Sequence, residues 1–252
     1  MQIDQLDIAM RVNDKLDELA NLSAAKRASF DSYDDEPEQR FYPHTRKDLL
    51  RQIAGTAKST ISRTVAHAFA KRKQLAASFF FNRTRDGRNG VRLFVTTIAK
   101  RLARVPSLRG PITAAIHEDP DLPDKGLQLQ FEKLIIEPLQ QLKSDGVSRP
   151  ALVLVVDALD EFSVETNANS GTQVDRNRLL VKLLARTAAT TGVMVRMFLT
   201  SRPELPVTLG FRDVPEESHN DVLLQNILNA IIEHDIRVFI NRQFEEIRRA
   251  TA

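Results

Sequence analysis

The chain has 252 residues, of which 42% are hydrophobic, and this suffices to bury one sizeable core in a single domain. Its 36 basic and 33 acidic residues leave a net charge of only +3, so nucleic acid is not an expected partner. The absence of cysteine excludes disulfides, thiolate metal sites and a cysteine nucleophile. There is neither a signal-peptide pattern nor a run of about 20 apolar residues, so we expect a cytoplasmic protein with no membrane partner.

The first part of the chain predicts a helix followed by an irregular segment. Apolar residues recur at near-helical spacing among charged ones, so residues 1–28 are expected to form an amphipathic connector helix. Residues 29–45 are acidic and then interrupted by proline, which is typical of a linker. Residues 46–252 are therefore expected to form the main domain.

Within this domain, apolar segments of strand length alternate with helical patterns. Continuous apolar strands separated by helices indicate an α/β fold, in which helices cover both faces of a parallel sheet. The strands are expected at 76–81, 152–156 and 195–199, with a further one at 221–225. The helices are expected at 59–72, at 176–191, near 230–250, and between 91 and 143, where Pro106, Gly110, Pro111, Pro120 and Pro123 would interrupt them.

The segment Ala-Gly-Thr-Ala-Lys-Ser-Thr, residues 54–60, opens the first of these helices and has part of the pattern of a phosphate-binding loop. In such a loop, backbone N–H groups wrap the phosphates, a lysine reaches the β and γ oxygens, and a hydroxyl holds Mg²⁺. Lys58 and Ser59 stand in the required order, but Gln52 and Ala57 occupy the two positions that call for glycine. Taken alone, the segment also fits an ordinary helix N-terminus.

A stronger signal is the run Leu-Val-Leu-Val-Val-Asp-Ala-Leu-Asp-Glu, residues 152–161. It places Asp157 at the carboxyl end of a buried strand, where open α/β sheets bind ligands. Asp157 would hold Mg²⁺, while Asp160 or Glu161 would orient or deprotonate an attacking water. The alternative is that these acids only cap the next helix and solvate the strand end.

A third polar tip, Thr-Ser-Arg-Pro at 200–203, follows the next predicted strand. An arginine at this edge could sense a γ-phosphate, which makes Arg202 a candidate site residue. The alternative is an arginine that solvates the turn before Pro203.

Together these segments resemble the NACHT domain of fungal STAND P-loop NTPases, the nephrocystin-like N-terminal family of NOD-like receptors. The resemblance implies a P-loop NTPase fold of the STAND and AAA type that acts as a switch. ADP would hold a closed monomer, ATP would favour an open assembled form, and slow hydrolysis would reset it. The matching stretches run in the family's order from about residue 30 to 248: AGTAKSTISRTVAHAFA, LAASFFFNR, RLFVTTIAKRLA, QFEKLIIEPL, LVLVVDALDE, FLTSRPELPVTLGFR and IIEHDIRVFI.

The resemblance also assigns ligands and roles. The cofactors would be ATP or ADP with Mg²⁺, with GTP as the alternative nucleotide, and the partners would be further copies of the chain or other NACHT proteins. Ser59 and Asp157 would bind the metal. Glu161 and Asp160 would assist hydrolysis, and Arg202 would act as the sensor. The nucleotide would be bound by Gly55, Thr56, Ala57, Lys58, Ser59 and Thr60.

One region departs from the family. Its members carry a strand that ends directly before the phosphate-binding loop, whereas here Asp48-Leu-Leu-Arg-Gln-Ile53 joins the loop directly, so the first strand is missing. Its loss is expected to leave an unpaired sheet edge or a cavity. Ala57 adds a methyl group where the backbone should approach phosphate, at a cost of about 1 kcal/mol or more.

Three interpretations therefore stay open. The chain is a nucleotide-binding switch with impaired hydrolysis, a pseudo-NTPase that serves as a protein-interaction module without nucleotide, or a truncated relic without function.

Overall fold

The computed structural model describes most of the predicted main domain. The predicted connector helix lies largely outside the described residues, and so do residues 32–57, which include Gly55, Thr56 and Ala57 of the predicted loop. The described residues are 19, 22–25, 28–31, 58–82, 91–142, 151–162, 173–189 and 194–223, together with 237, 241, 245 and 248.

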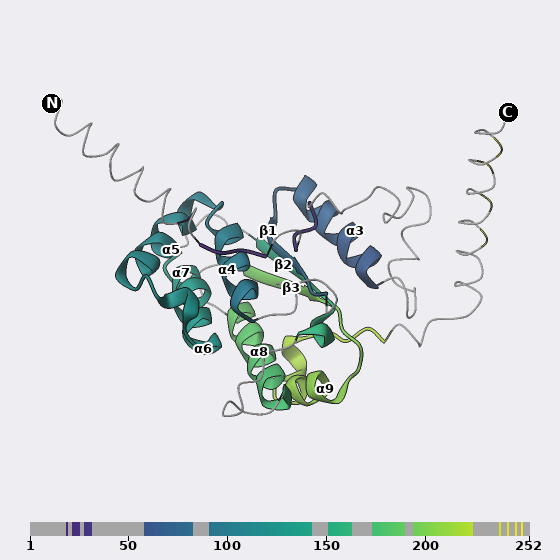
Figure 1. Cartoon of the computed structure of the whole chain (residues 1–252). Coiled ribbons are helices and arrows are strands. Elements are labelled where there is room, and N and C mark those ends of the chain that lie inside the picture. Colours follow the sequence, from purple (N-terminus) through teal and green to yellow (C-terminus); the bar gives the residue numbers. More distant parts are fainter. Residues whose placement is uncertain are drawn as a thin grey trace.

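Three strands form one parallel sheet, in the order β1-β2-β3 (Figure 1). They are β1 (Leu75–Phe80), β2 (Ala151–Asp157) and β3 (Met194–Leu199). Asp157 stands opposite Phe80, and Val156 stands opposite Leu199, so the strands end at the same edge of the sheet. The predicted α/β fold with a parallel sheet is confirmed, and three of its predicted strands lie within about one residue of their expected positions.

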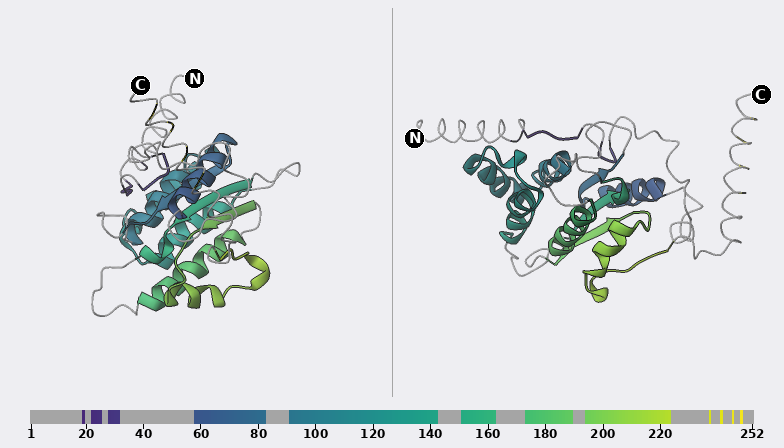
Figure 2. Two further views of the ribbon diagram at one scale, coloured as in Figure 1. Left: turned by 90° about the vertical axis from the view of Figure 1, so that its right-hand side faces the viewer. Right: turned by 60° about the horizontal axis from the view of Figure 1, so that its bottom comes forward.

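Helices surround this sheet (Figures 1 and 2). A π-helical turn, η3, joins two short helices into one continuous helical stretch from residue 127 to 140. No helix in the described part of the chain combines the length and apolar character needed to cross a membrane. The longer elements are α3 (Lys58–Lys71), α4 (Val91–Leu102), α5 (Pro106–Glu118), α6 (Leu127–Phe131), η3 (Glu132–Ile136), α7 (Glu137–Gln140), α8 (Gln173–Ala188) and α9 (Leu205–Arg212), and the short 3₁₀ turns are η2 (Leu122–Asp124), η4 (Leu159–Glu161) and η5 (Glu216–Ser218).

Alternation along the strands explains why both sheet faces are covered. Successive side chains of a strand point to opposite faces. In β2, Leu154 and Val156 join the larger core, which α4 and α8 also line, whereas Val153 and Val155 pack with Ala66 of α3 on the other face. Every residue of β2 after Ala151 is buried, and this is why its sequence is continuously apolar rather than alternating.

Aromatic side chains fill the centre of the larger core. The Phe94 ring lies 5.0 Å from that of Phe79 in an edge-to-face arrangement, 5.2 Å from that of Phe81 and 6.0 Å from that of Phe131. Phe81 also contacts Phe162 with the ring centres 5.8 Å apart. These contacts join β1, α4 and α6 to Phe162, which follows β2, so the chain segments on either side of Asp157 are packed into the core.

Residues before the main domain contribute to this core. Ala28 is fully buried, and its carbonyl accepts a 2.8 Å hydrogen bond from the Phe80 backbone N–H at the end of β1. The Ala25 N–H donates to Thr97 Oγ1 of α4 at 2.8 Å. The two terminal guanidinium nitrogens of Arg101, Nη1 and Nη2, each donate to a different oxygen of the Asp31 carboxylate. Residues 28–31 therefore pack on the domain, and the rest of the predicted linker, residues 32–45, lies outside the described residues.

Two expectations for the secondary structure are wrong. Gly110 and Pro111 lie inside α5 and do not interrupt it. Pro111 has no backbone N–H and therefore cannot donate the helical hydrogen bond to the Ser107 carbonyl. Because Ser107 is exposed, water can bind that carbonyl instead. The strand predicted at 221–225 does not begin at residues 221–223, which have no regular secondary structure. Val222 is 65% exposed, so its side chain is not packed in a core as that of a buried strand would be.

β3 lies at one edge of the described sheet, and this edge is relevant to the predicted loss of a strand. In the described part of the chain, β3 pairs with β2 alone, and Met194 is 43% exposed. The place of the lost strand in the sequence falls among residues outside the described part, so its loss stays a prediction.

Candidate functional site

Hydroxyl groups from two elements converge on the carboxylate of Asp157. Ser59 Oγ donates to Oδ2 at 2.5 Å, and Ser62 Oγ donates to Oδ1 at 2.6 Å. Thr200 Oγ1 also donates to Oδ1, at 2.6 Å. Asp157 is only 2% exposed, so these bonds replace the water that a charged group loses on burial.

The sequence places these groups together through two simple periodicities. Asp157 continues the alternation of Val153 and Val155, so its side chain lies on the face covered by α3. Ser59 and Ser62 are three residues apart on α3, which puts both hydroxyls on the same side of the helix.

Lys58 opens α3 and reaches the tip of β3. Its Nζ donates a 2.7 Å hydrogen bond to the carbonyl oxygen of Ser201. The lysine is thereby held beside the strand ends, in the same region as Asp157. An ammonium group at the start of a helix, next to the ends of parallel strands, is a suitable arrangement for binding a phosphate.

The backbone turns sharply after Asp157. Ala158 has a φ of 56° and lies in the left-handed region, which is uncommon for a residue other than glycine. Its N–H donates to Thr200 Oγ1 at 3.0 Å, and the Leu159 N–H donates to the Thr200 carbonyl at 2.8 Å. These two bonds stabilise the turn and fix the short helix η4, which carries Asp160 and Glu161.

Asp160 binds the backbone of the third polar tip. Its Oδ1 accepts a 2.8 Å hydrogen bond from the Arg202 N–H and a longer one, 3.4 Å, from Ser201 Oγ. The Arg202 guanidinium lies 3.7 Å from Oδ2, but its side chain is 69% exposed. Asp160 is 5% exposed, whereas Glu161 is only partly buried, so of the two acids Glu161 is the more accessible to a ligand from solvent.

The structure thus brings together most of the predicted site residues that it describes. Lys58, Ser59, Asp157, Asp160 and Arg202 all lie where α3 and the carboxyl ends of β2 and β3 meet. Thr60 is in the first turn of α3, and its carbonyl accepts a bond from Thr64 Oγ1 at 2.8 Å. Glu161 follows Asp160 in η4. The remaining predicted residues, Gly55, Thr56 and Ala57, are outside the described part.

The oxygen groups present suit Mg²⁺. This ion prefers oxygen ligands and usually takes one or two carboxylates together with substrate phosphates and water. Asp157 supplies a carboxylate and Ser59 a hydroxyl at the same point. Among the described residues there is no group of three or more His, Asp or Glu side chains that could hold a metal ion. A magnesium ion at Asp157 and Ser59 would take further ligands from phosphate oxygens and water.

Sequence reasoning assigned no role to two residues of this site, Ser62 and Thr200. The signal for Ser62 was its spacing of three from Ser59 on a predicted helix. The signal for Thr200 was its place directly after an apolar strand that is parallel to the one ending in Asp157.

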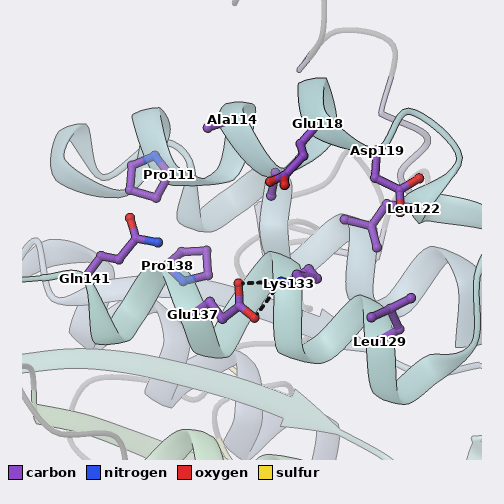
Figure 3. A pocket seen from close by; sticks show the side chains of 11 residues that line it. Pro111, Ala114, Glu118, Asp119, Leu122, Leu129, Lys133, Glu137, Pro138 and Gln141 are labelled. Atoms are coloured by element: carbon purple, nitrogen blue, oxygen red, sulfur yellow. Dashed lines mark hydrogen bonds and ion pairs between the residues drawn. The ribbon is translucent and has the colours of Figure 1, made fainter.

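A separate pocket lies on the helical layer and includes none of these residues (Figure 3). It has a volume of about 350 Å³ between α5 and the helical stretch that ends with α7. Lys133 and Glu137 form an ion pair of 2.9 Å on its wall. The lining mixes proline, alanine and leucine side chains with five polar ones, Glu118, Asp119, Lys133, Glu137 and Gln141, and the Lys133 ammonium is already paired with Glu137, so we base no site on it.

Comparison with known proteins identifies one family. The family described as Nephrocystin 3, N-terminal, matches residues 40–202, which is more than half of the chain. The match begins before α3 and ends at Arg202, so it includes residues 54–60 and 152–161 and all of the segment 200–203 except Pro203. No curated protein and no solved structure gives a significant match.

Proposed function

Because the chain belongs to the nephrocystin-3 N-terminal family, we propose that it is a NACHT-type domain that binds ATP together with Mg²⁺ and hydrolyses it slowly or not at all. The order and spacing of its motifs support a role as the nucleotide switch of a fungal NOD-like receptor. GTP is the alternative nucleotide.

The observation that carries this proposal is the hydrogen bond of 2.5 Å between Ser59 and Asp157, which are 98 residues apart. It joins the first turn of a helix to the end of a buried strand, and Lys58 lies at the start of that same helix. A hydroxyl, a carboxylate and an ammonium group that meet at the carboxyl edge of a parallel sheet suit a magnesium ion bound to a nucleoside triphosphate.

Each side chain would have a distinct role. Lys58 would exchange its bond to the Ser201 carbonyl for the β- and γ-phosphate oxygens, and Ser59 and Asp157 would hold Mg²⁺. When bound, the metal neutralises phosphate charge. Glu161 is the candidate for orienting water because it is less buried than Asp160. Arg202, with an exposed side chain on a fixed backbone, is the candidate for sensing the γ-phosphate.

A binding titration of the purified full chain tests the proposal. We expect a fluorescent ATP analogue to bind in the presence of Mg²⁺, and Lys58→Ala to weaken that binding by about 10- to 100-fold, because a charge-assisted hydrogen bond is lost. Lys71→Ala is the matched control, since Lys71 ends the same helix and is exposed. Absence of binding by the unaltered chain, or equal binding by both variants, would refute the proposal.

The second candidate is a pseudo-NTPase that acts as a protein-interaction module, for example by joining other NACHT proteins. The observation that favours it is that Ser59, Ser62 and Thr200 already satisfy the carboxylate of Asp157, which fastens α3 to the sheet without nucleotide. Gln52 and Ala57 in place of glycine also favour it. It predicts no nucleotide binding by the native chain and recovered binding when both glycines and the lost strand are restored.

A further inference from the structure

We infer that Ser62 and Thr200 are positioning residues for the metal-binding carboxylate of Asp157, an assignment that rests on the function proposed above. They hold one carboxylate oxygen, Oδ1, and so direct the other oxygen, Oδ2, toward Ser59 and the metal.

The two oxygens of Asp157 have different partners. Oδ1 accepts hydrogen bonds of 2.6 Å from both Ser62 and Thr200. Oδ2 accepts a bond from Ser59 alone among the hydroxyls described here. Ser59, which was predicted to share the metal, thus bonds Oδ2. Ser62 and Thr200, which had no predicted role, bond Oδ1.

The direction of the bond from Thr200 is fixed by its surroundings. Its hydroxyl oxygen accepts the Ala158 N–H at 3.0 Å, so its single proton is left for the carboxylate, which has no proton of its own when ionised. Ala158 is the left-handed residue directly after Asp157. Thr200 therefore fixes both the side chain of Asp157 and the backbone turn that follows it.

Ser62 is set in place by burial. Its side chain is completely buried in the layer between α3 and the sheet. A serine inside a helix commonly bonds the carbonyl four residues earlier, as Thr64 does with Thr60 at 2.8 Å. Ser62 instead donates to a carboxylate 95 residues away. Because the bond joins α3 to β2, it sets the position of Ser59, one turn earlier, relative to Oδ2.

Groups that fix a metal-binding carboxylate raise the affinity for the metal, and their loss typically weakens it by about 10- to 100-fold. A merely structural hydroxyl would change the stability of the fold but not the contribution of the metal to nucleotide affinity. The ratio of ATP affinity with and without Mg²⁺ separates these two roles.

The experiment measures this ratio for the full chain by titration with a fluorescent ATP analogue, in MgCl₂ and in EDTA. Ser62→Ala and Thr200→Val are expected to lower the ratio by about 10-fold or more. Thr200→Ser keeps the hydroxyl and should retain the ratio of the unaltered chain. Thr64→Val removes a hydroxyl from the same helix that bonds only within it, and it should also leave the ratio unchanged. Thermal unfolding of each variant verifies that it is folded.

The outcomes distinguish this inference from the proposed function. If the chain binds nucleotide with Mg²⁺ but Ser62→Ala and Thr200→Val keep its ratio, the positioning role is wrong and the proposed function stands. If the chain binds no nucleotide, the proposed function fails, and Mn²⁺ alone is titrated by electron paramagnetic resonance. Mn²⁺ uptake that both variants weaken would support the positioning role, whereas no uptake, or equal uptake by all variants, would overturn it.

Discussion

The backbone N–H of Arg202 donates a 2.8 Å hydrogen bond to Oδ1 of Asp160, across 42 residues of sequence. This bond fastens the polar tip after β3 to the short helix after β2. An acid that was predicted to assist hydrolysis thus also holds the backbone of the predicted sensor. The two ends of the site are coupled through Asp160, and changes at this residue should affect stability as well as chemistry.

Replacing Asp160 tests this structural role. Asp160→Ala removes the charged acceptor of this partly buried hydrogen bond, and we expect a loss of about 1–3 kcal/mol in the free energy of unfolding. Asp160→Asn keeps an acceptor oxygen and should cost clearly less. Urea denaturation of the full chain measures both values. Equal losses for the two variants would show that the charge, and not the acceptor, is what stabilises this bond.

Gly210 allows α8 and α9 to approach closely. A Cβ atom at this position would lie 2.9 Å from Val181 Cγ2 and 3.4 Å from the Arg178 Cα. Because Val181 is buried and its branched side chain is stiff, Gly210→Ala should destabilise the fold by about 1 kcal/mol or more, even after the gain in helix propensity. Chemical denaturation provides the measurement.

Gly110→Ala is the matched control for this change. Gly110 also lies inside a helix, but a Cβ there would meet no atom within 4 Å. Because Gly110 precedes Pro111, whose ring disfavours helical backbone at a preceding residue with a Cβ, the gain in helix propensity is largely offset, and the free energy of unfolding should change by less than about 0.5 kcal/mol. A destabilising effect of similar size at both glycines would contradict the proposed close approach.

Phe94 is the central ring of the aromatic cluster. It is fully buried and lies within 6.0 Å of Phe79, Phe81 and Phe131, measured between ring centres. Phe94→Ala should lower the free energy of unfolding by about 3–5 kcal/mol because it leaves a cavity. Phe94→Leu fills part of that space and should cost less. A loss below about 1 kcal/mol for Phe94→Ala would show that the site collapses around the smaller side chain.

The ion pair between Asp31 and Arg101 should make stability depend on pH. Burial raises the pKa of Asp31, but hydrogen bonds from Arg101 and Ser29 lower it more, so the net pKa lies below the usual value of an aspartate. A lowered pKa in the folded state means that the ionised group stabilises the fold above its unfolded pKa, near 4. This contribution is lost as the pH falls further, through the folded pKa.

Asp31→Asn is therefore expected to be less stable than the unaltered chain at pH 7, and the difference should shrink below about pH 4. The side chain of Asp31 is 43% exposed, so solvent screening limits the effect to about 1 kcal/mol or less. Denaturation at pH 7, 5 and 3 measures it. A difference that stays constant over this range would exclude ionisation of Asp31 as its cause.

Several features of the fold follow from local sequence alone. The apolar run before Asp157 predicts a buried strand because a parallel strand covered on both faces must be apolar throughout. The start of α3 next to Lys58 was also predictable, since the helical pattern and the motif begin together. The parallel alignment of the strands, inferred from their alternation with helices, placed Asp157 and Arg202 at the same edge.

Only the tertiary structure decided how the polar groups at this edge are used. The sequence gives no sign that Ser62 and Thr200 share one oxygen of Asp157, because they come from elements 95 and 43 residues away. It gives no sign either that the carboxylate of Asp160 accepts a backbone N–H from the neighbouring strand tip. Local patterns determine which face a side chain lies on, whereas hydrogen-bond partners depend on how strands and helices are aligned in space, and this alignment is set by the packing of the whole core.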